Sequence, residues 1–188
     1  MSIQNPVPKI SLEELRLEIK KEYTNVALDP NKGYHFHTGH RLAALLGYEA
    51  SLYAGVPESN IASFAGTGNP FSVGPIHPGE TVVDIGSGAG FDSLIASHLV
   101  GQAGRVIGFD MTEEMLNLAR RGAEAMGATN VEFRQGLAES LPLPDATADV
   151  EPRARLLADR RAGRRGSVLD APQDAQEFPA WTGRPRSV

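Results

Sequence analysis

Three alternating glycines and two aspartates carry the clearest chemical signal in this chain of 188 residues. Gly86, Gly88 and Gly90 follow an apolar run that contains Asp84, and Asp110 closes a second apolar run 20 residues after the last of these glycines. Glycines at the end of a strand let the backbone approach a ligand, and a carboxylate at the end of the next strand can accept hydrogen bonds from two ribose hydroxyls. The pattern therefore predicts a site for a small molecule that contains adenosine.

The spacing of the glycines discriminates between such ligands. In the dinucleotide fingerprint G-x-G-x-x-G the third glycine comes one residue later, and a pyrophosphate lies on the helix N-terminus. Here the loop is tighter, and Asp84 would repel a pyrophosphate, whereas it could accept hydrogen bonds from an ammonium group. The loop therefore favours a cationic amino-acid sulfonium nucleoside, and an NAD-dependent oxidoreductase is the disfavoured alternative.

The elements that must position these residues alternate between strand and helix. Continuous apolar runs predict three buried parallel strands, at 81–85, 105–109 and 130–134. One helix is expected to start at Phe91, and a second to run from Thr112 as its N-cap to Gly127. This order predicts right-handed βαβ units and an α/β, Rossmann-like fold.

Residues 1–78 predict a helical N-terminal cap ahead of the first strand. Ser11 begins a serine-x-x-glutamate capping box for a helix over 12–23, whose leucine stripe is interpreted as a packing face. A second helix is expected over 41–48, and a third is expected to start near Pro57.

The pattern breaks near residue 150, where a fourth strand should continue. Pro152 would stand in that strand, and proline is confined to edge strands because it cannot donate to the ladder. Two interpretations are open for 151–188: a loosely attached arginine-rich tail, or a segment from a shifted reading frame or an aberrant splice. We favour the second, because the tail has eight arginines and no lysine, whereas all four lysines of the chain precede residue 33.

The expected organisation is therefore a cap over 1–78, a partial cofactor-binding domain over 79–150 and a tail over 151–188 that is not native to the fold. An incomplete sheet of three strands would leave the strand at 81–85 as an unpaired apolar edge.

Around the glycines the chain resembles the class I S-adenosylmethionine-dependent methyltransferases. Residues 83–90, Val-Asp-Ile-Gly-Ser-Gly-Ala-Gly, match their first motif, residues 108–112 match the second, and residues 137–142 resemble the third, which frames the adenine. Residues 34–39 and 66–71 are similar to the N-terminal cap of the arsenite methyltransferase branch. The resemblance covers about residues 20 to 150.

The resemblance implies S-adenosyl-L-methionine as the cofactor. In this family Asp84 would orient the loop and the amino group, Asp110 would hold the ribose hydroxyls, and Met111 would lie against the adenine, so the two aspartates are expected to face a shared hollow. The full set of cofactor-binding residues that it implies is Asp84, Gly86, Ser87, Gly88, Gly90, Asp110, Met111, Leu137 and Ala138.

The implied activity is in-line transfer of the sulfonium methyl to a small-molecule acceptor, with arsenite as the acceptor of the branch. That branch holds arsenic with cysteines, because soft arsenic(III) prefers thiolates, and this chain has no cysteine. Two hypotheses therefore stay open: a methyltransferase of the arsenite type by lineage, and a non-catalytic fragment that at most binds the cofactor weakly. No catalytic side chain is assigned.

Three histidines, His35, His37 and His40, suggest a metal cluster at first sight. The family resemblance explains the first two as part of the cap, and ligand spacing without supporting second-layer hydrogen bonds is weak support for a metal. We therefore predict no metal site.

Composition limits the partners. The chain carries a net charge of −5, and an acidic body gives no reason to expect nucleic-acid binding. No run of 18 apolar residues suggests a membrane span, and the N-terminus lacks the basic start and apolar stretch of a secretory signal. A cytoplasmic location is the expectation, and the oligomeric state is not predicted.

Overall fold

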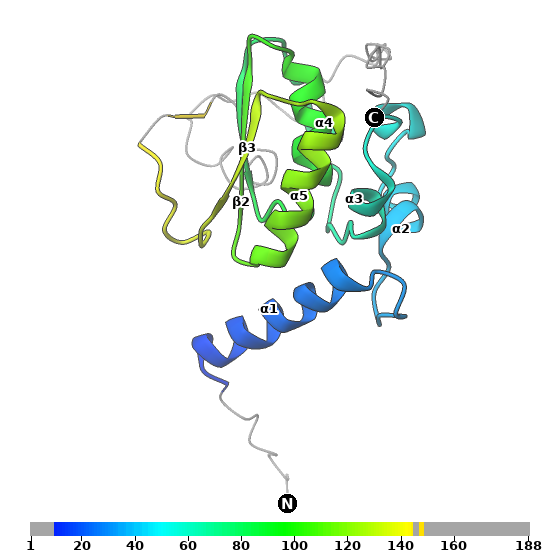
Figure 1. Ribbon diagram of the computed structural model, residues 1–188, viewed down its shortest axis with the longest axis vertical. Helices are drawn as coiled ribbons and strands as arrows, with labels where there is room; N and C mark the ends of the chain where they lie inside the picture. Colours follow the sequence, from blue (N-terminus) through cyan, green and yellow to red (C-terminus); the bar gives the residue numbers. More distant parts are fainter. Residues whose placement is uncertain (1–9, 145–146, 149–188) are drawn as a thin grey trace, which may run out of the picture.

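A three-stranded parallel sheet lies at the centre of the computed structural model, which describes residues 10–144 and 147–148 (Figure 1). Its strands, in spatial order, are β1 (Thr81–Ile85), β2 (Arg105–Asp110) and β3 (Val131–Gln135). All three lie within a residue of the predicted runs. The predicted class, an incomplete Rossmann-like α/β fold with a helical cap, is confirmed.

Two crossover helices, α4 (Phe91–Val100) and α5 (Glu113–Met126), cover one face of the sheet (Figure 1). Val82 and Val106 on that face are fully buried beside Val100. Burying each such side chain contributes roughly 1.5–3 kcal/mol. The helices therefore hold β1 and β2 together on this face of the sheet.

The opposite face of the sheet is also apolar. Alternate residues of a strand point to opposite sides, and here Val83, Ile107 and Phe109 form a buried cluster. Leu141 and Leu143, from the segment after β3, lie against this cluster. Both faces of the sheet are thus covered within the described residues, as the unbroken apolar strands predicted.

The elements of the cap, residues 10–78, are α1 (Leu12–Leu28), α2 (Gly39–Leu45), the 3₁₀ turn η1 (Ala50–Tyr53), α3 (Glu58–Ala62) and the 3₁₀ turn η2 (Pro70–Val73). Helices α2 and α3 lie beside α4 and α5 on the side away from the sheet, whereas α1 runs below the lower end of the sheet in this view (Figure 1). A cluster of aromatic rings joins the cap to the start of α4: Phe91 lies 4.3 Å from Phe64 and 5.3 Å from Tyr48, measured between ring centroids.

Helix α1 continues five residues beyond its predicted end, to Leu28. The reason is tertiary packing, because Val26 is fully buried in a cluster with Met115 and Leu118 of α5, and burial overrides weak local propensity. The capping box at Ser11 is present, and its hydrogen bonds with the Glu14 carboxylate lower the pKa of that group.

The N-cap of α5 is Thr112, as predicted, but its hydroxyl makes no capping hydrogen bond. Its backbone N–H donates instead to the Asp110 carboxylate, which therefore organises the start of α5. Helix α2 begins and ends earlier than predicted. It ends earlier because Gly47 turns the chain at a φ of 75°.

The expected break of the fourth strand and the arginine-rich tail lie outside the described residues. Within the described part, β1 pairs with β2 alone. None of the helices described is both long and apolar enough to cross a membrane.

Candidate cofactor-binding site

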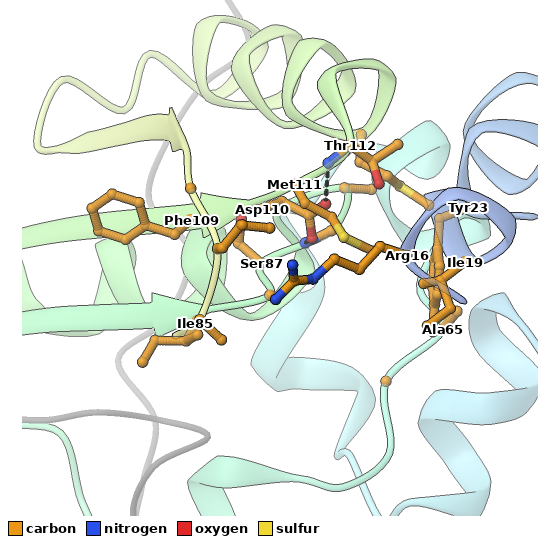
Figure 2. Close-up of a pocket in the computed structure, with 18 of the residues that line it drawn as sticks. Arg16, Ile19, Tyr23, Ala65, Ile85, Ser87, Phe109, Asp110, Met111 and Thr112 are labelled. Atoms are coloured by element: carbon orange, nitrogen blue, oxygen red, sulfur yellow. Dashed lines mark hydrogen bonds between the residues drawn. The ribbon is translucent and has the colours of Figure 1, made fainter. Parts of the chain in front are cut away.

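A cavity of about 330 Å³ opens at the carboxyl ends of β1 and β2 (Figure 2). One wall, the strand-end wall, comprises residues 85–89, 109–112 and 136–139. The other, the cap wall, comprises residues 63–66 and one side of α1 from Leu12 to Tyr23. The site therefore needs both the sheet and the cap, and ligands of open α/β sheets bind at this edge.

The glycine loop, residues 86–90, is held against β2 by its backbone. The N–H groups of Gly86 and Ser87 donate to the carbonyl of Phe109 at 2.7 and 2.8 Å. Gly86, Gly88 and Gly90 have φ values of 76°, 52° and 82°, a region that favours glycine. The alternating glycines therefore favour this loop conformation, in which other residues would be strained.

The three glycines do different work. Gly86 and Gly88 line the cavity, and a Cβ at Gly88 would meet nothing within 4 Å. Gly90 ends the loop, and a Cβ there would be 2.8 Å from the Cβ of Ala119 and 2.9 Å from Cζ of Phe133. Gly90 therefore lets α4 start close to α5 and β3. It does not line the cavity, so its expected contact with the cofactor stays a prediction.

Asp110 ties the loop to the start of α5. Its Oδ2 accepts a hydrogen bond from the N–H of Gly88 at 2.9 Å, and its Oδ1 accepts one from the N–H of Thr112 at 2.8 Å (Figure 2 shows the second). A carboxylate has about four lone-pair sites, so these two bonds leave acceptor capacity. Asp110 lines the cavity, as the sequence predicted.

Asp84 occupies a different place from the one expected. Only 1% of its surface is exposed, and its Oδ2 accepts a hydrogen bond from the hydroxyl of Ser93 in α4 at 2.7 Å. The carboxylate lies behind the loop and does not contribute to the cavity lining. Its position fits the expected role in orienting the loop, whereas its contact with an amino group stays a prediction.

A second acid, Asp92, faces the cavity in its place. This buried residue in the first turn of α4 accepts a hydrogen bond from the hydroxyl of Tyr48 at 2.6 Å. An acid at the positive end of a helix is favourable, but that signal alone gave no reason to assign Asp92 to the site. The hydrogen bond joins residues 44 positions apart and is visible only in the fold.

The cap wall contributes the guanidinium of Arg16, which reaches from α1 toward Ser87 and Met111 (Figure 2). Arg16 forms an ion pair of 2.8 Å with Glu139, at the edge of the strand-end wall. The hydrogen bond from Arg16 lowers the pKa of the Glu139 carboxyl below its ordinary value. The charged side chains among the lining residues are thus one cation and three acids: Arg16, Asp92, Asp110 and Glu139. This balance suits a ligand with net positive charge.

Most of the predicted cofactor residues come together around this cavity: Gly86, Ser87, Gly88, Asp110, Met111, Leu137 and Ala138. Asp84 and Gly90 do not line the cavity. The α1 face was not predicted as a cavity wall, because a leucine stripe on a helix indicates burial without identifying the surface that it covers. Asp92, Glu139 and the segment 63–66 were not predicted as site residues either.

The acceptor capacity of Asp110 and the acidic balance of the lining fit a nucleoside that also carries a cationic amino-acid group. Ser87 lines the same cavity, but its hydroxyl is itself buried, and it has no hydrogen-bond partner within the described part of the chain.

The three histidines of the cap do not form a cluster with other metal-binding side chains in the described residues. His40 instead lies 3.0 Å from the carboxylate of Glu58 at the surface, measured from Nε2 to Oε2.

Comparison with known proteins decides the family. A family model for a methyltransferase domain matches residues 76–170, half of the chain. The chain belongs to this methyltransferase family. The match includes all three strands and extends 20 residues beyond the point at which the apolar pattern breaks. S-adenosyl-L-methionine is the cofactor that this membership implies.

Among its relatives, the arsenite methyltransferase of Halobacterium salinarum is 46% identical over 105 residues, which cover 56% of this chain and 27% of that protein. The ubiquinone/menaquinone biosynthesis C-methyltransferase UbiE of Escherichia coli is 40% identical over 75 residues, covering 39% of this chain and 30% of the relative. The chain therefore spans less than a third of the length of these curated relatives.

A solved structure, that of an arsenic(III) S-adenosylmethionine methyltransferase from Chlamydomonas reinhardtii, is 35% identical to this chain. The similarity covers 54% of this chain and 36% of that one, with a TM-score of 0.48.

Proposed function

We propose that the cavity binds S-adenosyl-L-methionine and that the chain acts in methyl transfer to a small-molecule acceptor. The observation that carries the proposal is the joint placement of the glycine loop and Asp110 on one wall, in a chain of the methyltransferase family. Hydrogen bonds already hold these groups in place without a ligand, so little ordering is needed on binding.

The residues of the strand-end wall would divide the cofactor between them. Asp110 has the acceptor capacity for two ribose hydroxyls. Met111 and Leu137 offer apolar surface for the adenine. Asp92 supplies negative charge near the start of α4 for a cationic group.

When bound, S-adenosyl-L-methionine supplies an electrophilic methyl group on a positively charged sulfur. Methyl transfer by in-line displacement mainly requires that the reacting groups be held in line. The part of this chain in that chemistry is therefore to bind and orient, through the locked glycine loop, and to limit access of water, through α1 across the cavity.

We propose that the chain descends from the arsenite branch of the family. The curated arsenite methyltransferases, at 44% and 46% identity, support this lineage. The match to a quinone C-methyltransferase shows how widely this domain is shared. Because the chain contains no cysteine, a soft arsenic(III) centre would find no thiolate of this chain to bind. We therefore expect its acceptor to differ from free arsenite.

Isothermal titration with S-adenosyl-L-methionine and with its product S-adenosylhomocysteine tests the binding step. Saturable binding with a Kd in the micromolar range, which is about −8 kcal/mol, supports the proposal, and no binding at millimolar ligand contradicts it. A turnover assay with methyl-labelled cofactor and arsenite plus thiol then tests the acceptor. Label transferred to arsenic would contradict the proposed departure from arsenite, and binding without any turnover would favour a non-catalytic binder.

A further inference from the structure

One side chain of the cap is buried between the glycine loop and α5. Asn60, in α3, has no exposed surface. Its amide Nδ2 donates to the carbonyl of Ala89 at 2.7 Å and to the carbonyl of Leu118 at 3.0 Å. Ala89 lies in the glycine loop and lines the cavity, and Leu118 lies in α5. A single amide group thus joins the cap, the loop and the second crossover helix.

The side-chain amide of Asn60 is packed closely against Gly122 of α5. A Cβ at Gly122 of α5 would lie 2.4 Å from Nδ2 of Asn60 and 2.7 Å from its Oδ1. Glycine inside a helix is less favourable than alanine. Helix α5 therefore carries a weak helix former at the place where Asn60 enters, and the close approach that Gly122 allows is needed for the two hydrogen bonds.

The bonded carbonyl has a particular place in the loop. Ala89 directly precedes Gly90, where the chain turns into α4 with a φ of 82°. A hydrogen bond to the Ala89 carbonyl fixes the orientation of the peptide plane between these two residues. On the other side of this plane, the N–H of Gly90 donates to the carbonyl of Ser87 at 2.8 Å, and Ser87 lines the cavity.

We propose that Asn60 is a positioning residue for the cofactor, which holds the exit of the glycine loop in its binding conformation. The inference rests on the proposed function. It assigns to the cap a second role besides forming a wall, since α3 both carries Asn60 and leads directly into the wall segment 63–66.

The chain offers a matched control. Asn130, just before β3, also donates from Nδ2 to two backbone carbonyls, those of Ser97 and Gly101, each at 2.8 Å. These bonds lie at the carboxyl end of α4, and Asn130 does not line the cavity. Asn60→Ala and Asn130→Ala therefore remove the same kind and number of bonds, and only the first removes them at the loop.

The experiment compares the wild type, Asn60→Ala and Asn130→Ala by urea unfolding and by titration with S-adenosylhomocysteine. Both variants are expected to lower the urea midpoint. Asn60→Ala should raise the Kd by about tenfold or more, while Asn130→Ala should change it by less than about twofold. Gly122→Ala keeps the amide but displaces it, and should also raise the Kd although alanine favours the helix.

Equal affinity of folded Asn60→Ala and the wild type would overturn the inference, and so would an equal loss of affinity in Asn130→Ala. If Asn60→Ala does not fold, Gly122→Ala decides: a wild-type Kd would overturn the inference. If the wild type itself binds no S-adenosylhomocysteine, the proposed function fails, and hydrogen exchange at the N–H groups of Gly90 and Leu94 decides instead. Faster exchange there in Asn60→Ala but not in Asn130→Ala supports the positioning role, and equal exchange overturns it.

Discussion

The two walls of the cavity are built on different principles. The strand-end wall is fixed by hydrogen bonds that backbone N–H groups of the glycine loop donate, from Gly86 and Ser87 to the carbonyl of Phe109 and from Gly88 to the carboxylate of Asp110. The first half of α1 is held far less firmly. Leu12 and Leu15 are 60% and 46% exposed although they line the cavity, and an ion pair with Glu139 joins the helix to the opposite wall.

Helix α1 is nevertheless anchored at its other end. Val26 is fully buried against α5, and the hydroxyl of Thr24 donates to the carboxylate of Glu114 at 3.1 Å. One end of the helix is thus part of the core, while the other end lies over the cavity. We therefore expect the strand-end wall to set the geometry of a bound ligand and α1 to cover it.

The strand-end wall should break most severely at Gly90. We expect Gly90→Ala to lower the free energy of unfolding by about 2–4 kcal/mol, because a left-handed φ and a close contact with Phe133 both oppose a side chain. Gly88→Ala has a similar φ but open space, and should cost only about 1–2 kcal/mol. Urea unfolding of both variants measures the difference. Equal losses would show that backbone strain, not close packing, requires glycine at 90.

Asp110 should control affinity more than stability. We expect Asp110→Asn to raise the Kd for S-adenosylhomocysteine roughly 10- to 100-fold, because the amide loses an acceptor for the ribose and for one of two backbone N–H groups. Titration measures the Kd, and urea unfolding separates affinity from folding.

Asp84→Asn is the comparison for this variant. Asp84 is buried behind the loop, so the substitution should cost about 1–3 kcal/mol of stability and less affinity than Asp110→Asn does. A larger loss of affinity in Asp84→Asn would show that this acid contacts the ligand after all.

Asp84 and Asp110 also show how much of the site could be predicted from the sequence. The strands could be predicted because buried parallel strands are continuous apolar runs, and the glycine loop because its conformation depends on the alternating glycines at 86–90. Both aspartates lie in those local patterns. Which of them faces the cavity depends on side-chain direction, which Ser93 and Thr112 determine in the fold.

The cap wall could not be predicted from the sequence, because its contacts join residues that lie far apart in the chain. The Arg16–Glu139 pair joins residues 123 positions apart, and the Asn60 bond to Leu118 spans 58 positions. A periodic pattern predicts that a helix has a buried face, but it does not name the surface that this face covers. The cavity residues of α1 therefore became apparent only from the structure.

The junction between the walls should be sensitive to Tyr48. We expect Tyr48→Phe to lower stability by about 1.5 kcal/mol, because it removes the buried hydrogen bond to the Asp92 carboxylate. Tyr34→Phe is the control, since its hydroxyl donates to the carbonyl of Asp29 at an exposed position, and should cost less than about 0.5 kcal/mol. Equal urea midpoints for the two variants would contradict a structural role of the Tyr48 hydroxyl.

The smallest effect is expected at the ion pair of α1. The hydrogen bond from Arg16 lowers the pKa of Glu139 in the folded chain below the ordinary value of 4.5. The stabilisation is therefore complete above pH 4.5 and is lost as the pH falls through the lowered pKa. We expect the amides of Leu15 and Ile19 to exchange faster there, by less than about threefold beyond the intrinsic pH dependence, because the pair is exposed.

Glu139→Gln isolates this contact from the capping box at Ser11, where the pKa of Glu14 is lowered as well and titrates in the same acidic range. Glutamine cannot titrate, so the variant should lose the part of the pH dependence that the ion pair causes and keep the part that the capping box causes. If the wild type and Glu139→Gln show the same pH dependence of amide exchange, the contact with Glu139 does not hold the N-terminal half of α1 over the cavity. The buried anchor at Val26 would then be sufficient to place the whole helix.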